Sequence, residues 1–226
     1  MGQKFSRVGS PDPHKDPFGK IDFRIAAQMR AYSKADAPPT RVKPVPITLV
    51  VHALNFAYWT APTAERQVVA NLMCLAFFFC LWPGEYTSTT TDDQAFALDA
   101  IAFFLGSQRL HNALSTDHEL EAATSMQLTF TTQKNGIRGD VIAHSRSRDP
   151  LCCPVTATLR QFMLHRHESL RTTTYYNSHH VRVPVTASMI TQTMRCHAGT
   201  LEPMTGISPK HLSARSLRAG GAMALL

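Results

Sequence analysis

The feature that most constrains the fold is a fifteen-residue apolar run from Val68 to Trp82, interrupted only by Asn71. Gln67 precedes the run, and the helix-stopping pair Pro83-Gly84 follows it. A membrane-spanning helix needs about 20 apolar residues. The run therefore predicts a buried core helix over 63–81 in a soluble protein, with no membrane as a partner.

A second apolar pattern at helical spacing, from Ile47 to Trp59, predicts a core helix just before this run. Six prolines break residues 1–45 and leave room for one helix, from about Ile21 to Ser33. We therefore expect an arm and linker over 1–45 and one globular domain over 46–226. A chain of 226 residues is long enough for one such domain to bury a core.

The remaining segments predict a small antiparallel sheet followed by helices, which makes an α+β domain that is about half helical. Asn135-Gly136 lies between two β-rich runs and is a strong hairpin signal. Pro154 suits the first position of a helix, and Thr186 and Ser213 suit helix caps. The predicted strands are 95–105, which could equally be a helix, 125–132 and 140–144, and the predicted later helices are 154–170, 186–197 and 213–226.

Five cysteines in a chain without a secretion signal favour free thiols in a reducing compartment. The adjacent Cys152 and Cys153 are best interpreted as small buried residues at a helix start. A metalloenzyme built on histidines is not favoured, because adjacent or alternate histidines share no helix face and no carboxylate cluster accompanies them. We therefore expect no metal and no cofactor. The histidines of such a metal site would be His165, His167, His179 and His180.

Charge is unevenly distributed along the chain. Residues 1–45 carry a net charge of +5, residues 46–133 carry −6, and residues 134–226 carry +8. Two basic blocks that flank an acidic one, with a pI near 9.4, are typical of proteins with a positive face that binds nucleic acid. Many basic domains bind no anion, so this pattern alone leaves the partner open.

Three short segments could carry chemistry. Arg215 and Arg218 are spaced to share one helix face and precede the small residues Ala-Gly-Gly-Ala, which let another backbone approach closely. This pair could grip a phosphate or belong to a solvated helix face. Glu85 follows the apolar helix and could orient a cation or solvate the turn, and Lys134 lies at the predicted hairpin tip.

Taken in order, the three segments resemble the tyrosine recombinase (phage integrase) superfamily, in particular its eukaryotic mobile-element branch. In that family a helix ends in an arginine and glutamate box, a hairpin carries a lysine, and a late helix holds His-x-x-Arg followed by small residues. The likeness covers about 46–226. It implies that the preceding arm is a linker from a helical DNA-binding domain.

The resemblance implies a DNA breaking-rejoining type of catalytic fold, in which a tyrosine attacks a phosphodiester and cations neutralise the developing charge. Arg218 matches the second phosphate-binding arginine, Lys134 the hairpin lysine and Glu85 the acidic partner. Trp82 stands where the first arginine is expected, and Arg215 stands where the family has histidine. An indole carries no charge, and an arginine is no base near neutral pH.

The family's nucleophilic tyrosine lies beyond the segment that matches, and all five tyrosines precede the late box. We therefore expect a catalytically inactive, incomplete recombinase-like domain that binds double-stranded DNA, with other recombinase subunits as further partners. A nuclear location would follow if the chain comes from a eukaryotic mobile element. The rival hypothesis is an interaction module or mobile-element remnant that has lost DNA binding and leaves a sheet edge and an apolar groove uncovered.

Overall fold

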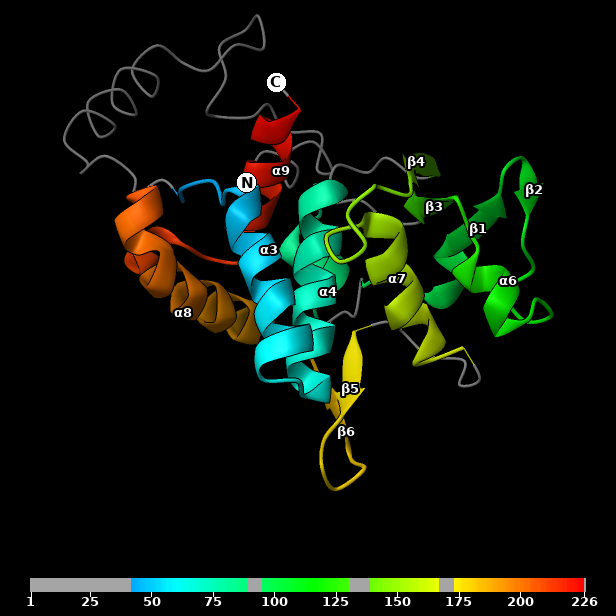
Figure 1. The fold of residues 1–226 in the computed structure, drawn as a ribbon, viewed down its shortest axis with the longest axis horizontal. Helices are drawn as coiled ribbons and strands as arrows, with labels where there is room; N and C mark the ends of the chain where they lie inside the picture. Colours follow the sequence, from blue (N-terminus) through cyan, green and yellow to red (C-terminus); the bar gives the residue numbers. More distant parts are fainter. Residues whose placement is uncertain (1–41, 89–94, 131–138, 167–172, 226) are drawn as a thin grey trace, which may run out of the picture. The chain divides into compact units, whose positions relative to one another are not determined.

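A computed structural model describes residues 42–88, 95–130, 139–166 and 173–225. The part described belongs to one compact unit, Val42–Leu226, and it has the mixed α+β architecture predicted from the sequence (Figure 1). The predicted arm lies outside the described residues, apart from residues 42–45. Described elements in chain order are α3 (Ile47–Asn55), a π-helical turn (Phe56–Thr60), α4 (Ala64–Phe78), α5 (Pro83–Tyr86), a 3-10 turn (Leu98–Ala100), β1 (Ile101–Leu105), β2 (Gln108–Arg109), α6 (Asp117–Glu121), β3 (Ser125–Phe130), β4 (Asp140–Ser145), α7 (Pro154–Met163), β5 (Thr174–Tyr176), β6 (Arg182–Pro184), α8 (Ala187–Thr205), a 3-10 turn (Pro209–His211) and α9 (Arg215–Ala224).

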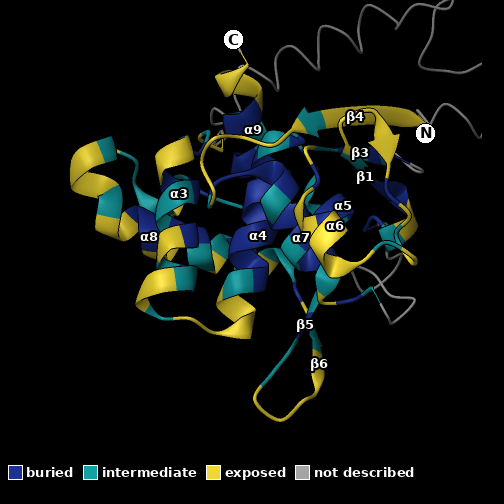
Figure 2. Ribbon diagram, turned by 45° about the vertical axis from the view of Figure 1, so that its right-hand side comes forward, coloured by how far each residue is buried: buried dark blue, intermediate teal, exposed yellow. Residues whose placement is uncertain are grey.

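Helix α4 is the centre of the core, as its apolar run predicts. Every residue from Val68 to Phe77 is buried, and α3, α7, α8 and α9 all pack against it (Figure 2). Its interruption, Asn71, is 1% exposed and pairs its amide with the Tyr58 hydroxyl at 2.9–3.1 Å. The Thr63 hydroxyl caps the helix by accepting from the Arg66 N–H. No helix within the described ranges is long and apolar enough to cross a membrane.

The end of α4 differs from the prediction. The helix stops at Phe78 and not at Leu81, because Cys80 adopts the left-handed conformation with φ 52°. The Leu81 N–H donates to the Ala76 carbonyl and the Cys80 N–H to the Phe77 carbonyl, which is the hydrogen-bond pattern of a Schellman cap. Because glycine usually occupies that position, a cysteine there hides the signal, and Pro83 instead begins the short helix α5.

The main sheet has the strand order β2-β1-β3-β4, all antiparallel. Strands β3 and β4 pair from Ser125 with Ser145 to Phe130 with Asp140, which confirms the predicted hairpin partners. The turn signal Asn135-Gly136 lies outside the described residues. The segment 95–105 splits into a 3-10 turn and β1, so the strand interpretation holds only for its second half.

The later helices begin near the predicted residues but end elsewhere. Helix α7 begins at Pro154 and ends at Met163, and Cys152 and Cys153 are buried at its start as expected. Helix α8 continues past His197 to Thr205, where Gly206 caps it with φ 65°. The N-cap of α9 is Ala214 and not Ser213, and no side chain in the described part of the chain caps it.

Candidate functional site

Close packing of two helices forms the candidate site. A Cβ atom on Gly220 would lie 2.1 Å from the Val45 carbonyl oxygen, and one on Gly221 would lie 1.9 Å from the Phe77 carbonyl oxygen. Only glycine therefore lets α9 lie this close to the end of α4. The Val45 N–H also donates to the Ser216 carbonyl at 3.1 Å. This contact confirms the close approach that the sequence predicts, and it brings Arg218 to the turn that follows α4.

Arg218 is half-buried against that turn. Its Nη1 donates to the Cys80 carbonyl oxygen at 2.6 Å, across 138 positions of sequence. Its guanidinium carbon lies 4.4 Å from the centroid of the Trp82 ring, which is a cation–π contact. The guanidinium is thus held on one side by a carbonyl and on another by an aromatic face.

Glu85 joins the same cluster from α5. Its Oε2 accepts from the backbone N–H of Trp82 at 2.7 Å, and Glu85 is only 8% exposed. Burial raises the pKa of the Glu85 carboxyl, while the Trp82 N–H and the positive charge of Arg218 oppose that shift. Glu85 therefore caps the turn and lies in the field of Arg218, and its burial contradicts the interpretation that it only solvates the turn.

The structure brings together only part of the predicted set of site residues. Glu85 and Arg218 meet at Trp82, as described above. Arg215 is exposed on α9, and no polar contact of its side chain is found among the described residues. Lys134 lies outside the described residues. The sequence shows only that Trp82 stands where an arginine is expected, and it carries no sign that the indole contacts Arg218.

Tyr86 fixes the geometry between α5 and α9. The residue is 0% exposed, and its hydroxyl donates to the Ala214 carbonyl at 2.9 Å. Burial raises the pKa of this phenol far above its usual range, so the hydroxyl stays protonated and remains a donor. Because Ala214 caps α9, this hydrogen bond sets where the helix with Arg218 begins.

We expect Tyr86→Phe to lower the free energy of unfolding by about 1–2 kcal/mol, because the buried Ala214 carbonyl loses its donor while the ring packing is kept. Urea denaturation measures the change. Tyr176→Phe is the matched control, because that residue is half-buried and its hydroxyl accepts from the long Arg182 side chain on an exposed hairpin. Equal effects of the two substitutions would contradict the role given to Tyr86.

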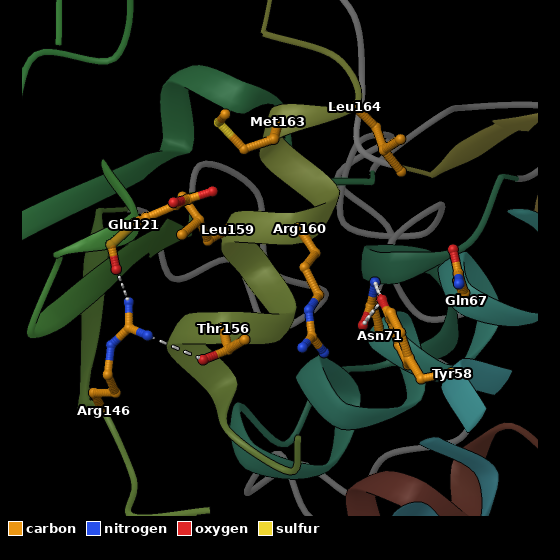
Figure 3. Close-up of a pocket in the computed structure, with 10 residues that line it drawn as sticks. All are labelled: Tyr58, Gln67, Asn71, Glu121, Arg146, Thr156, Leu159, Arg160, Met163 and Leu164. Carbon is orange, nitrogen blue, oxygen red and sulfur yellow. Dashed lines mark hydrogen bonds between the residues drawn. The ribbon is translucent and has the colours of Figure 1, made fainter. Parts of the chain in front are cut away.

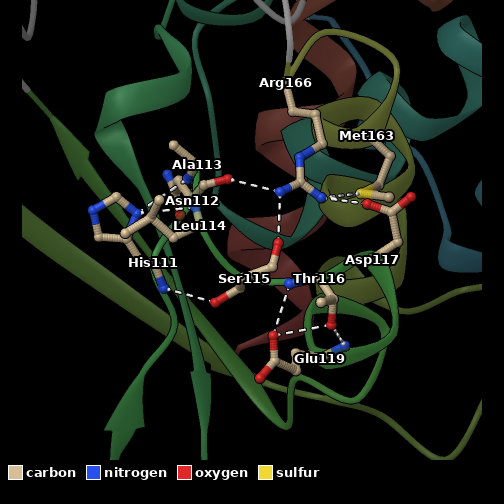
Figure 4. A network of polar contacts seen from close by, with 10 residues as sticks. All are labelled: His111, Asn112, Ala113, Leu114, Ser115, Thr116, Asp117, Glu119, Met163 and Arg166. Carbon is tan, nitrogen blue, oxygen red and sulfur yellow. Dashed lines mark hydrogen bonds and ion pairs between the residues drawn. The ribbon is translucent and has the colours of Figure 1, made fainter.

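Several other cations of the basic C-terminal block bind internal carbonyls. Arg166 pairs with Asp117 and donates to the Ser115 carbonyl at 2.6 Å and the Asn112 carbonyl at 3.3 Å (Figure 4). The Arg166 side chain is only 5% exposed. Arg195 donates to the Leu212 carbonyl at 3.0 Å. The net charge of this block therefore overstates the positive charge that a ligand can reach.

The comparisons with known proteins give no family for the chain. No protein-family model matches it, and neither the curated proteins nor the solved structures contain a match. Among the described residues, no group of three or more His, Cys, Asp and Glu side chains is placed to hold a metal ion.

Proposed function

We propose that this chain is a DNA-binding, tyrosine-recombinase-like domain of the DNA recombination and integration type, with a phosphate-binding site around Arg218 and no catalytic activity. The observation that carries the proposal is the meeting of Arg218 from α9 with Trp82 and Glu85 from the turn after α4. The resemblance noted in the sequence requires these two distant segments to meet. The order of core helices, antiparallel hairpin and late helix agrees with it.

The composition of the cluster favours binding over cleavage. A guanidinium has five N–H donors, and one of those on Arg218 is used by the Cys80 carbonyl. The others can donate to the oxygens of a DNA phosphate. The second guanidinium of a two-arginine clamp is replaced by the Trp82 ring, and Arg215 cannot take up or release a proton near neutral pH. A phosphate would thus be held without the charge and proton transfer that cleavage needs.

Binding to duplex DNA should fall steeply as salt rises, because each neutralised phosphate releases counterions. We expect the double variant Arg218→Ala, Lys134→Ala to bind more weakly and to lower the slope of log affinity against log salt by about 2. Fluorescence anisotropy of a labelled duplex across a salt series measures both quantities. A control variant must remove the same positive charge elsewhere, because only then can the loss of two phosphate contacts be distinguished from a general loss of charge.

The matched control is therefore Arg109→Ala, Arg148→Ala, which removes the same charge at two exposed positions, one on β2 and one after β4. This control should keep most of the affinity and nearly the full salt slope. Binding that ignores salt, or an equal loss in both double variants, would refute the phosphate site.

One observation favours the rival function, an interaction module without DNA binding. Among the described strands, β4 lies at an edge of the sheet (Figure 2). Its apolar residues Val141 and Ile142 are 52% and 36% exposed. An exposed apolar edge can pair with another strand. If this function holds, the chain should associate as its concentration rises and should show no salt-dependent DNA binding, and Val141→Lys should abolish the association in sedimentation velocity.

A further inference from the structure

A groove of about 530 Å³ lies along α7 (Figure 3), and its lining residues do not include Arg218, Trp82 or Glu85. Its volume is within the range of small-molecule sites. Arg160 and the pair Tyr58 and Asn71 line one part, and Arg146 lines another. Leu159 and Met163 supply apolar surface between them.

Arg160 is a half-buried cation, and no carboxylate among the described residues forms an ion pair with it. Its guanidinium carbon lies 4.3 Å from the centroid of the Tyr58 ring. Its Nη1 is shielded from solvent and has no hydrogen-bond partner within the described part of the chain. The one ion pair found among the described residues joins Arg166 to Asp117. No carboxylate in the described ranges therefore offsets the cost of partly burying the Arg160 charge.

Tyr58, which stacks on Arg160, does not supply a negative charge to balance the guanidinium. Burial raises the pKa of the Tyr58 phenol, although the Asn71 amide and the charge of Arg160 act in the opposite direction. The phenol is thus neutral at physiological pH. Because Asn71 is fixed inside α4 and holds the Tyr58 hydroxyl, the ring forms a rigid platform for the guanidinium.

Arg146 adds a second fixed positive charge to the lining. Its Nε and Nη2 each donate at 2.7 Å, to the Ala123 and Glu121 carbonyls, and its Nη1 lies 3.4 Å from the Thr156 hydroxyl. Among the described residues that line the groove, the Glu121 carboxylate is the single acidic group, against two guanidiniums. The groove therefore combines net positive charge with an apolar wall.

We propose that this groove binds a small organic anion, in which a carboxylate or phosphate group is attached to an aromatic or apolar body. The oxyanion pairs with Arg160, and the body packs on Leu159 and Met163. This combination of a few fixed polar groups and apolar walls is typical of ligand pockets. The proposal is independent of DNA binding through Arg218.

The test is a titration of the full chain followed by ¹H–¹⁵N NMR, with phenyl phosphate and benzoate as anionic probes and benzamide as the neutral probe. We expect saturable shifts of α7 residues with both anions and none with benzamide. The tighter of the two anions identifies the headgroup. Arg160→Met should weaken binding at least tenfold, because a charge-assisted contact is lost. Arg109→Met, at an exposed arginine on β2, should leave it unchanged.

A second variant keeps the proposal testable if Arg160→Met does not fold. Leu164 is 50% exposed at the groove, so Leu164→Trp should fold normally, fill the groove and abolish the shifts. Benzamide binding as tightly as benzoate, or unchanged affinity in Arg160→Met, would overturn the proposal. Displacement of phenyl phosphate by a DNA duplex, with the same dependence on Arg160, would assign the groove to nucleic acid instead.

Discussion

Gly221→Ala is expected to lower the free energy of unfolding by about 3 kcal/mol or more, or to prevent folding. The new methyl group would lie 1.9 Å from the Phe77 carbonyl oxygen, which belongs to the last turn of α4 and cannot move like a flexible side chain. Overpacking of a core typically costs 1–3 kcal/mol, and a clash with backbone lies at the upper end. Gly220→Ala should act in the same direction, through the Val45 carbonyl at 2.1 Å.

The control variant, Gly199→Ala, is expected to raise the free energy of unfolding. Gly199 is also inside a helix, α8, but a Cβ there would meet only the Pro209 side chain at 3.8 Å. Alanine has the better helix propensity, so Gly199→Ala should raise stability by about 0.5–1 kcal/mol. Urea denaturation of the two variants gives both values. If Gly221→Ala also stabilises the protein, then α9 does not pack on α4 in the way described.

Acidification from pH 7 to pH 4 is expected to destabilise the protein by about 2–3 kcal/mol through His197. This side chain is 6% exposed on α8, and its Nδ1 lies 3.1 Å from the Nδ1 of His52 on α3. Burial, followed by the positive charges of His52 and Arg66, lowers the pKa of His197 from 6.5 to about 4. Between these values the unfolded chain binds a proton that the folded chain does not.

The sign of the effect follows from that difference in proton binding. The contribution of His197 to the free energy of unfolding is fully present above pH 6.5 and is lost as the pH falls towards 4. Burial also lowers the pKa of His144, which adds to the loss. His197→Leu should flatten the dependence of unfolding free energy on pH over this range, as measured by urea denaturation. An equally steep pH dependence in His197→Leu would contradict this role of His197.

Local signals predicted where most helices begin. Thr63, Pro154 and Thr186 each stand where the structure begins a helix, because a cap or a first-turn proline acts within a few residues of chain. Helix ends were less predictable. Cys80 ends α4 in a conformation that favours glycine, whereas α8 continues to the more typical signal at Gly206.

The two-stranded hairpin β5–β6 was not predicted, because its strands are only three residues long. Its turn is organised by Asn177, whose side-chain oxygen accepts from the His179 and Val181 N–H groups, both at 2.9 Å. Helix α6 carries a signal that could have been found, since Thr116 and Glu119 form a capping box.

The sequence alone determined the central helix, the pairing of β3 with β4 and the close approach at Gly220 and Gly221, because period, turn residues and side-chain size act locally. Only the tertiary structure decided the surroundings of Arg218. Its partners, Cys80 and Trp82, come from a turn that lies far away in the sequence, 138 positions for Cys80, and they reach it because two glycines let α9 contact the end of α4. No local pattern encodes that meeting, since it depends on how two helices pack.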